Sequence, residues 1–207
     1  DGNKSSDVSI VRTGAANLAS VVAAYERLGR SVKLTDTACA VRNAKRVVLP
    51  GVGAIAPVAA QLRENGLGDA VRDRVAQDRP TLTVCLGLHL MAESSQEGEG
   101  AEGLGLLAVG VSRFPSSVVV PQLGWNSIEA DSGCTLLTDG DAYFANSYRI
   151  EDPPTGWSVA WSDHGGRFVA AVERGNVLGC QFHPELSGSW GEGLLERWLS
   201  RSGGASC

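Results

Sequence analysis

The sequence predicts an α/β fold in which helices flank a central, mostly parallel sheet, with a nucleophile elbow at one strand end. Through the first half of the chain, short apolar runs alternate with helix-like segments, a pattern typical of parallel βαβ units. Cys85 directly follows one such run, and residues that suit a helix come next. With 207 residues, 43% of them hydrophobic, the chain can bury the core of one domain.

Strands and helices alternate up to the cysteine. The first helix has the clearest limits, because Asn17 can cap it, its apolar residues share one face and Gly29 can end it. The expected strands cover residues 8–11, 32–34, 46–49 and 82–84, and the expected helices cover residues 18–28, 57–64 and 68–77.

Beyond residue 91 the pattern changes. Residues 93–105 are polar and rich in glycine, which predicts a surface loop. Residues 106–120 and 157–182 contain short β-branched runs that predict strands, and residues 191–199 predict a final helix. No linker divides the chain. The expected organisation is a disordered tail over residues 1–7, one domain over residues 8–200 and a C-terminal tail over residues 201–207.

The composition argues against several classes of protein. A net charge of −5 and a pI near 5.2, with no basic run, argue against nucleic acid and an anionic membrane surface as partners. No apolar stretch reaches the roughly 18 residues of a membrane span, and the N-terminus is unlike a signal peptide, so we expect a cytoplasmic protein. Five cysteines without a CxxC pair indicate neither a disulfide framework nor a zinc site, and we expect no metal or cofactor.

Cys85 is the first candidate for chemistry. An elbow would push its sulfur out of the sheet, and the helix N-terminus behind it would favour the thiolate and offer backbone N–H groups to an oxyanion. Most lone cysteines are small buried hydrophobes, and this stretch by itself leaves the two interpretations level.

The stretch from His183 to Glu185 shifts the balance towards chemistry. Pro184 disfavours helix at His183, and an extended pair two residues apart projects both side chains to one side. A carboxylate this near can fix the tautomer of the imidazole and stabilise its cation. His-Pro-Glu alone is also typical of a surface turn, but with Cys85 it supplies a nucleophile, a base and an orienting group.

The chain resembles the class I glutamine amidotransferases over residues 8–199, and the resemblance implies their single-domain fold. Three motifs carry it, in the family's order: Pro50-Gly51-Val52-Gly53, Cys85-Leu86-Gly87 and His183-Pro184-Glu185. Within this class, flanking stretches resemble the glutaminase subunits of imidazole glycerol phosphate synthases. These stretches are residues 17–21, 49–54, 120–126, 143–148 and 181–187.

The resemblance implies a glutaminase that hydrolyses glutamine to glutamate and ammonia. Cys85 would attack the side-chain amide, His183 would carry the thiol proton to the departing ammonia, and Glu185 would orient His183. The oxyanion would be held by the Leu86 N–H and by an N–H of the turn at Gly51 and Val52. The positions that match the family's glutamine-binding residues are Gly53, His89, Glu97, Asn146, Ser147 and Tyr148, with Glu97 taking the α-ammonium.

The resemblance also implies a partner. Ammonia would pass to a (β/α)8-barrel cyclase that makes imidazole glycerol phosphate and AICAR in histidine biosynthesis, and the two chains would form a heterodimer. Asn17, Trp125 and Leu186 match the partner face.

The chain departs from the family pattern at the pocket and the partner face. The family usually has glycine at the position of Thr83 and glutamine at that of His89. It has histidine at the position of Gln122 and lysine at that of Leu186. His89 fits either a glutamine contact or a satisfied buried histidine, and Trp125 fits either the interface or the core. Two other functions stay open: another class I amidotransferase, and a catalytically weak regulatory binding subunit.

Overall fold

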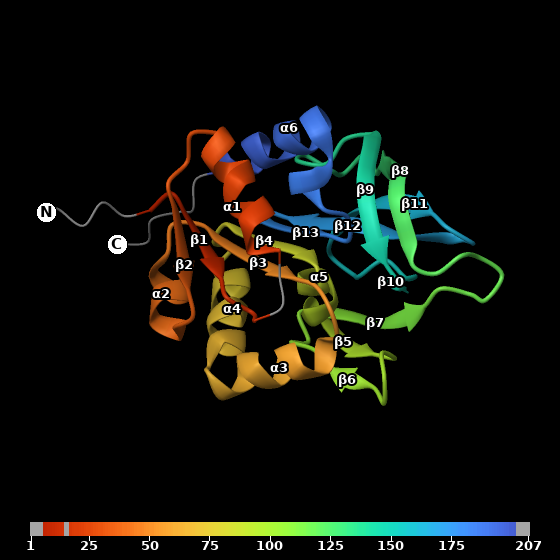
Figure 1. The fold of residues 1–207 in the computed structure, drawn as a ribbon, viewed down its shortest axis with the longest axis horizontal. Helices are drawn as coiled ribbons and strands as arrows, with labels where there is room; N and C mark the ends of the chain where they lie inside the picture. Colours follow the sequence, from red (N-terminus) through yellow and green to blue (C-terminus); the bar gives the residue numbers. More distant parts are fainter. Residues whose placement is uncertain (1–5, 15–16, 202–207) are drawn as a thin grey trace, which may run out of the picture.

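The computed structural model describes residues 6–14 and 17–201, which form an α/β fold with one large sheet (Figure 1). The strands of this sheet are β1 (Val8–Val11), β2 (Val32–Thr35), β3 (Val47–Gly51), β4 (Thr81–Cys85), β8 (Gln122–Ala130), β9 (Gly140–Asn146), β11 (Ser158–Asp163), β12 (Arg167–Arg174) and β13 (Val177–Cys180). Their order is β2-β1-β3-β4-β13-β12-β11-β8-β9. Neighbours are parallel from β2 to β13 and antiparallel from β13 to β9. The expected α/β fold with a central sheet is confirmed.

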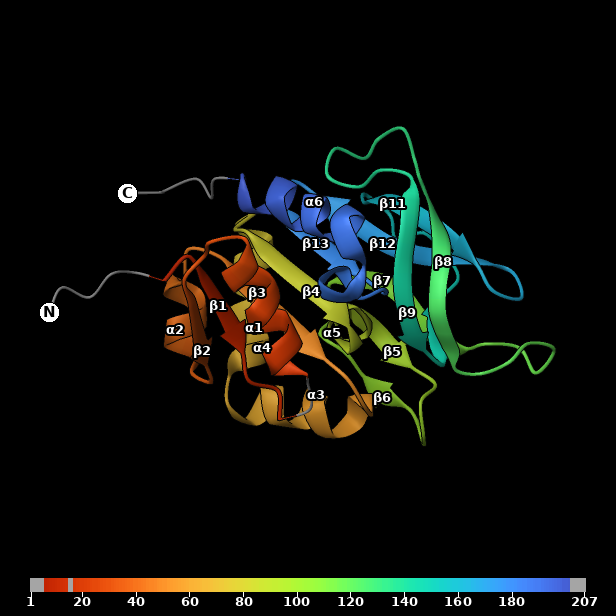
Figure 2. The ribbon, with the colours of Figure 1, turned by 45° about the horizontal axis from the view of Figure 1, so that its top comes forward.

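Helices cover both faces of the sheet (Figures 1 and 2). One face carries α1 (Leu18–Arg27) and α6 (Gly188–Leu199), and the other carries α3 (Ile55–Glu64), α4 (Leu67–Ala76) and α5 (Leu86–Met91). Successive strand residues point to opposite faces and so divide the core in two. Val48 belongs to the core under α1 and α6, whereas its neighbours Val47 and Leu49 belong to the core under the other three helices.

A smaller sheet corrects one expectation. It contains β5 (Ala92–Ser95), β6 (Ala101–Glu102), β7 (Leu107–Arg113) and β10 (Tyr148–Ile150), in the order β10-β7-β5-β6. The surface loop predicted over residues 93–105 is therefore wrong in part, because β5 and β6 lie there. Strand β5 exposes Glu93 and Ser94 and buries Ala92 and Ser95. With one apolar side chain in four residues, it gives no hydrophobic pattern.

Helix limits follow local chemistry where that chemistry is visible in the sequence. Asn17 caps α1 as predicted, since its Oδ1 accepts from the Ser20 N–H at 3.4 Å. Helix α3 begins at Ile55, two residues before the predicted start at Pro57. Proline is tolerated in the first helical turn, because the N–H that it lacks would have no partner there anyway. Helix α6 begins at Gly188, three residues earlier than expected. Helix α2 (Ala38–Asn43) was not predicted. Val41 is its one buried residue, so its sequence has no periodic apolar face to indicate a helix.

The chain ends are described only in part. Asp7 is held in place, because its carboxylate accepts from the Ser31 N–H at 3.1 Å and its own N–H donates to the Ser31 hydroxyl at 3.0 Å. Residues 1–5 of the predicted N-terminal tail and residues 202–207 of the predicted C-terminal tail lie outside the described residues, so the tails stay predictions. Over the described part of the chain, no helix is long and apolar enough to span a membrane.

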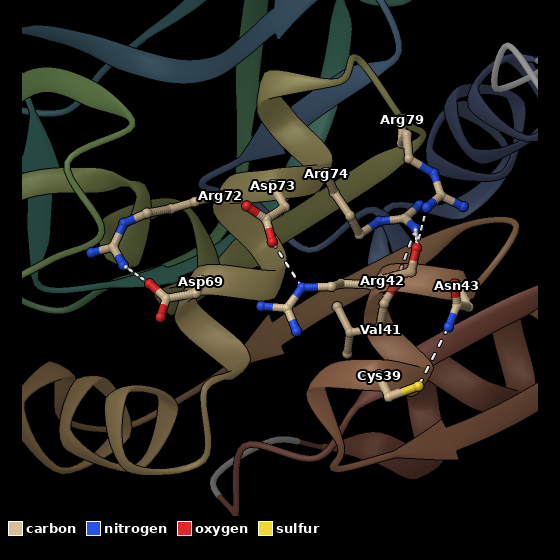
Figure 3. A network of polar contacts seen from close by, with 9 residues as sticks. All are labelled: Cys39, Val41, Arg42, Asn43, Asp69, Arg72, Asp73, Arg74 and Arg79. Atoms are coloured by element: carbon tan, nitrogen blue, oxygen red, sulfur yellow. Dashed lines mark hydrogen bonds and ion pairs between the residues drawn. The ribbon is translucent and has the colours of Figure 1, made fainter. Parts of the chain in front are cut away.

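A buried arginine ties α4 to α2 (Figure 3). The guanidinium of Arg74 donates to the carbonyl oxygens of Val41 at 3.1 Å, Ala44 at 2.8 Å and Pro80 at 2.6 Å. Burial, helped by the charge of Arg79, lowers the pKa of Arg74 to about 9, so the side chain is still a cation at neutral pH. Arg74 thus binds the chain just before β4 begins, at the opposite end of that strand from Cys85.

Candidate active site

The elbow forms at Cys85, where β4 ends and α5 begins. Cys85 has φ 53° and ψ −109°, a backbone conformation that residues other than glycine rarely adopt. Such strain persists only where the surrounding structure imposes it, and it is concentrated at functional sites. Gly87 permits the sharp turn, because a Cβ at that position would lie 2.1 Å from the carbonyl oxygen of Leu49.

His183 and Glu185 meet through a turn and not through a strand. His183 is extended, with φ −99° and ψ 96°, as Pro184 predicts, but Glu185 lies in a short 3-10 helix, η1 (Pro184–Leu186). The turn sets His183 Nδ1 2.9 Å from Glu185 Oε1. The expectation that both side chains project from one strand is therefore wrong, although the contact that it predicted is present.

Electrostatic interactions couple His183 and Glu185 to Cys85. Burial opposes the imidazolium, but hydrogen bonds to Cys85 and Glu185 and the charges of both outweigh it and raise the pKa of His183 to about 10. The backbone of His183 is also fixed, since its N–H donates to the Tyr143 carbonyl at 2.9 Å. Its own carbonyl accepts from the Ser187 hydroxyl at 2.6 Å. The three side chains therefore form one hydrogen-bonded series.

A cavity of about 470 Å³ opens over this series, within the usual range for small-ligand sites. It brings together most of the residues that the sequence singled out, including the proposed nucleophile. Those that line it are Val52, Gly53, Cys85, Leu86, His89, Glu97, Asn146, Ser147, Tyr148 and His183. Ala54 and Ala145 also line it, and a methyl group gives no signal in the sequence by which to predict this. Gly51 and Glu185 do not line the cavity.

The residues expected at the oxyanion lie around the elbow. Gly51 ends β3 and is in register with Cys85 on β4. A Cβ at Gly51 would lie 2.9 Å from the Cβ of Leu86, so only glycine fits there without a shift. Gly53 has φ 86°, a conformation that suits glycine. The turn between β3 and α3 thus stands beside the nucleophile and is built on glycines.

Glu97 has a role in the fold that the sequence did not show. Its Oε2 accepts from the N–H of Ile55, the first residue of α3, at 2.9 Å. No side chain of α3's own N-cap satisfies that helix end. A carboxylate there is stabilised by the partial positive charge of the helix N-terminus. Glu97 therefore brings a fixed negative charge to the cavity wall.

Asn146 offers a second polar group to the cavity. Its Nδ2 donates to the carbonyl oxygen of Tyr148 at 2.9 Å, whereas its buried Oδ1 has no hydrogen-bond partner among the described residues. A buried acceptor without a partner is unfavourable, so a ligand N–H in the cavity would satisfy it.

His89 meets both expectations made for it, because it lines the cavity and is also satisfied in the interior. Its Nε2 lies 2.5 Å from Oε1 of Gln181. Burial lowers the pKa of His89 to about 4, so the ring is neutral at neutral pH. Gln181 is a residue that sequence reasoning missed. Its Nε2 lies 3.9 Å from Cys85 Sγ, and the sequence signal for it was its place two residues before His183, in strand phase with it.

The residues expected at a partner interface lie on the surface. Trp125 is 59% exposed, which excludes the core position left open for it, and its ring centroid is 6.2 Å from that of Tyr143. Leu186 is 41% exposed, and Asn17 is exposed at the start of α1. Leu123 on the same strand as Trp125 is exposed as well. The structure thus presents large apolar side chains to solvent.

A strained cysteine at a strand–helix elbow, with a histidine and a glutamate in series over a small-ligand cavity, defines a class of α/β enzymes that use a cysteine nucleophile. The chain belongs to one family of this class, the class-I glutamine amidotransferases, whose sequence profile matches residues 10–200.

Within the family, the chain is similar to imidazole glycerol phosphate synthase subunits. Subunit HisH of Herpetosiphon aurantiacus is 37% identical over 206 residues, which cover 95% of this chain and 97% of that protein. Subunit HisH of Symbiobacterium thermophilum is 40% identical and covers 91% of each. The Arabidopsis thaliana protein named imidazole glycerol phosphate synthase hisHF, chloroplastic, is 37% identical, and the match covers 93% of this chain but 34% of that protein.

Solved structures support the fold. A crystal structure described as a glutamine amidotransferase has a TM-score of 0.71 at 23% identity and covers 92% of this chain and 96% of that one. A glutamine amidotransferase from Thermotoga maritima has a TM-score of 0.60 at 16% identity and covers 93% of this chain and 80% of that one.

Proposed function

We propose that the chain is the glutaminase subunit of an imidazole glycerol phosphate synthase and that residues 8–200 form its amidotransferase domain. The observation that carries the proposal is the hydrogen-bonded series of Cys85, His183 and Glu185 at the cavity of a class-I amidotransferase fold. The curated relatives, which match over nearly their whole length, supply the particular pathway.

The reaction follows from where the proton rests. With its pKa raised to about 10, the imidazole of His183 is a base that takes the thiol proton of Cys85 as the sulfur attacks. The sulfur forms a bond to the carbonyl carbon of the glutamine side chain, and the carbonyl electron pair moves to the oxygen. That oxyanion is held by the Leu86 N–H and by an N–H of the turn at Gly51 and Val52.

Collapse of the tetrahedral adduct breaks the C–N bond. His183 gives its proton to the leaving nitrogen, so the nitrogen departs as ammonia and a thioester remains on Cys85. Water then adds to the thioester, His183 takes one of its protons, and the C–S bond breaks to release glutamate. Glu185 keeps the imidazole in orientation throughout and stabilises its cation.

Glutamine is bound by the polar groups around the cavity. Glu97 receives the α-ammonium, since its carboxylate is the fixed negative charge at the wall. The free Oδ1 of Asn146 accepts a substrate N–H. The remaining contacts come from Gly53, His89 and the chain at Ser147 and Tyr148.

Ammonia then passes to a partner. The partner is a cyclase with a (β/α)8-barrel fold that uses the ammonia to make imidazole glycerol phosphate and AICAR. The two chains form a heterodimer. The Arabidopsis relative, whose name joins hisH and hisF in one chain, favours such a pairing. The partner face includes Asn17, Trp125 and Leu186, because exposed large apolar side chains are typical of interfaces.

The test is glutamate release from glutamine, measured with the cyclase of the same organism and its nucleotide substrate. We expect turnover by the wild type and by Cys39→Ala and Cys134→Ala, and none by Cys85→Ala. Turnover by Cys85→Ala would exclude the covalent route. A chain that binds the cyclase and never releases glutamate is the regulatory subunit instead. Release of glutamate without formation of imidazole glycerol phosphate would indicate another class I amidotransferase.

A further inference from the structure

Gln181 is a buried amide whose two ends touch chemically important groups. The residue has no exposed surface and is fixed by its own N–H, which donates to the Ala170 carbonyl at 2.8 Å. On one side its Oε1 lies 2.5 Å from His89 Nε2. On the other side its Nε2 lies 3.9 Å from Cys85 Sγ, in reach of a hydrogen bond to sulfur. The amide thus stands between α5 and the nucleophile.

The tautomer of His89 is coupled to which end of the amide faces the sulfur. Burial lowers the pKa of His89 to about 4, so at neutral pH the ring has one N–H donor and one acceptor nitrogen. Because Gln181 Oε1 can only accept, the nitrogen that faces it must carry the proton. The amide oxygen is then held at His89, and the NH2 group is left to face Cys85.

The opposite orientation of the amide would be unfavourable at this site. It would direct the partial negative charge of Oε1 at a negatively charged thiolate in a buried environment. An N–H directed at the thiolate is instead a charge-assisted hydrogen bond, which is stronger than a neutral one.

We propose that His89 is a positioning residue that fixes the amide of Gln181, and that Gln181 donates to the Cys85 thiolate and stabilises it. The inference rests on the proposed function, because it assumes that Cys85 is the nucleophile. It gives the histidine that replaces the usual glutamine of the family a definite task in this chain.

The measurement is the rate at which iodoacetamide alkylates Cys85 as a function of pH, in the isolated full chain. Mass spectrometry of the peptide that contains Cys85 separates it from the other cysteines. Other titratable groups face this site and are left intact: His183 and Glu185 at η1, and Glu97 and Tyr148 around the cavity. Their effects are common to all variants, so differences between variants report on the amide.

Gln181→Leu removes the donor and should move the midpoint of the pH–rate profile up by about one pH unit, with roughly tenfold slower alkylation at neutral pH. Gln181→Met is a second substitution that removes the donor and keeps a side chain of similar length, in case the Gln181→Leu variant does not fold. His89→Leu releases the amide and should move the midpoint in the same direction by less. The double variant of His89→Leu and Gln181→Leu should match Gln181→Leu alone, because the histidine acts only through the amide.

Two further variants separate positioning from packing. His89→Gln keeps a side-chain donor and should stay close to the wild-type profile. Thr83→Val is the matched control, because Thr83 is fully buried in β4 below the elbow and donates to Met91 Sδ, away from the amide. It should leave the profile unchanged.

The outcomes distinguish the inference from the proposed function. If wild-type Cys85 reacts readily and its alkylation stops glutamate release, but neither Gln181 variant moves the midpoint, the inference is wrong and the proposed function stands. If alkylation of Cys85 leaves glutamate release intact, the proposed function fails first. A His89→Gln midpoint as high as that of His89→Leu would also overturn the positioning role.

Discussion

The proton on His183 links catalysis and stability at the scale of single residues. Burial opposes the cation, yet contacts with Cys85 and Glu185 raise the pKa of His183 from 6.5 to about 10. The folded-state value lies above the unfolded one. The cation therefore stabilises the fold fully below about pH 6.5, and this contribution is lost as the pH rises towards 10.

If the three residues act as one catalytic unit, as we propose, the effects of their substitutions should not add. We expect His183→Ala in the Cys85→Ala background to lower single-turnover glutamate release hardly further than Cys85→Ala alone. Glu185→Gln should be milder than either single change, since it removes a charge and keeps the shape. Single-turnover assays of the four variants would check this. Glu185→Gln as inactive as Cys85→Ala would show that the roles are assigned wrongly.

His89 should make the chain sensitive to acid. Its pKa is lowered from 6.5 to about 4, so the folded state resists a proton that the unfolded state accepts, and stability falls as the pH drops through this range. Relative to His89→Gln, the wild type should lose about 2 kcal/mol of unfolding free energy between pH 7 and pH 5. Urea denaturation of both proteins at both pH values measures this, and His183 cancels because both proteins contain it. Parallel pH profiles would contradict the buried neutral state.

At the scale of elements, helices are held by side chains from distant parts of the chain. Arg74 on α4 binds the carbonyl oxygens at the end of α2, and Glu97 beyond β5 binds the first N–H of α3. Both contacts satisfy backbone groups that the helices leave open at their ends. The elements around the cavity are therefore fixed by polar contacts as well as by packing.

Arg74→Met should destabilise the fold strongly. It keeps much of the volume but removes the donor of the Val41 carbonyl and one of two donors from the carbonyls of Ala44 and Pro80, which also accept from Arg79 and from the Val47 N–H. A buried acceptor left unsatisfied costs about 1–3 kcal/mol, and the lost bonds came from a charged donor. We expect a loss of roughly 3 kcal/mol in urea denaturation. Arg27→Met is the control, because Arg27 forms an exposed pair with Glu192 and should change stability by less than about 1 kcal/mol. Equal losses in both would contradict this account.

Glu97→Gln tests the carboxylate that accepts from the first N–H of α3 and that we propose binds the substrate. Loss of the charge should raise KM for glutamine about tenfold or more, because a hydrogen bond to a charged group is worth about 1.5–3 kcal/mol. The rate at saturation should change little, since Glu97 does not touch the sulfur. Thermal unfolding should show a modest loss, because a charge at a helix N-terminus contributes about 0.3–1 kcal/mol at the surface and up to about 2 kcal/mol when it is partly buried, as Glu97 is. An unchanged KM would remove Glu97 from the glutamine site.

At the scale of the whole molecule, the cavity and the exposed apolar residues suggest control by a partner. The glycine-rich turn after β3 stands beside Cys85, and rotation of one peptide there would create or remove an oxyanion donor. A missing donor costs roughly 10²–10³ in rate, so a chain whose turn rests in the wrong orientation is nearly silent. A cyclase that selects the right orientation raises turnover by a population shift.

We therefore expect little glutamate release from the isolated chain and strong stimulation by the cyclase with its nucleotide substrate. Trp125→Ala should weaken the complex by about tenfold or more, since exposed tryptophans at interfaces are frequent hot spots. Because the side chain of Leu186 carries no charge, the contact at that position should depend little on salt. Glutaminase assays and titration calorimetry at low and high salt measure both effects. Full activity of the isolated chain would exclude control by the partner.

The sequence by itself determined the features that depend on neighbouring residues. The strand–cysteine–helix order predicted the elbow, Asn17 predicted the start of α1, and Pro184 predicted an extended His183. Each of these depends on turn chemistry, capping or proline geometry, which act within a few residues of the chain. The alternation of strands and helices predicted the α/β fold for the same reason, because hydrophobic period is a local property.

Only the tertiary structure decided the contacts between distant segments. Residues 92–95 became a strand because β7 was there to pair with them, although their sequence is polar. Gln181 reached Cys85, and Glu97 reached the start of α3, across separations of 96 and 42 residues. Trp125 could have packed inside or outside, and its place on the surface was set by the side of β8 that faces solvent. Such outcomes depend on which surfaces the packed sheet and helices bury, and this is settled only when the whole chain has folded.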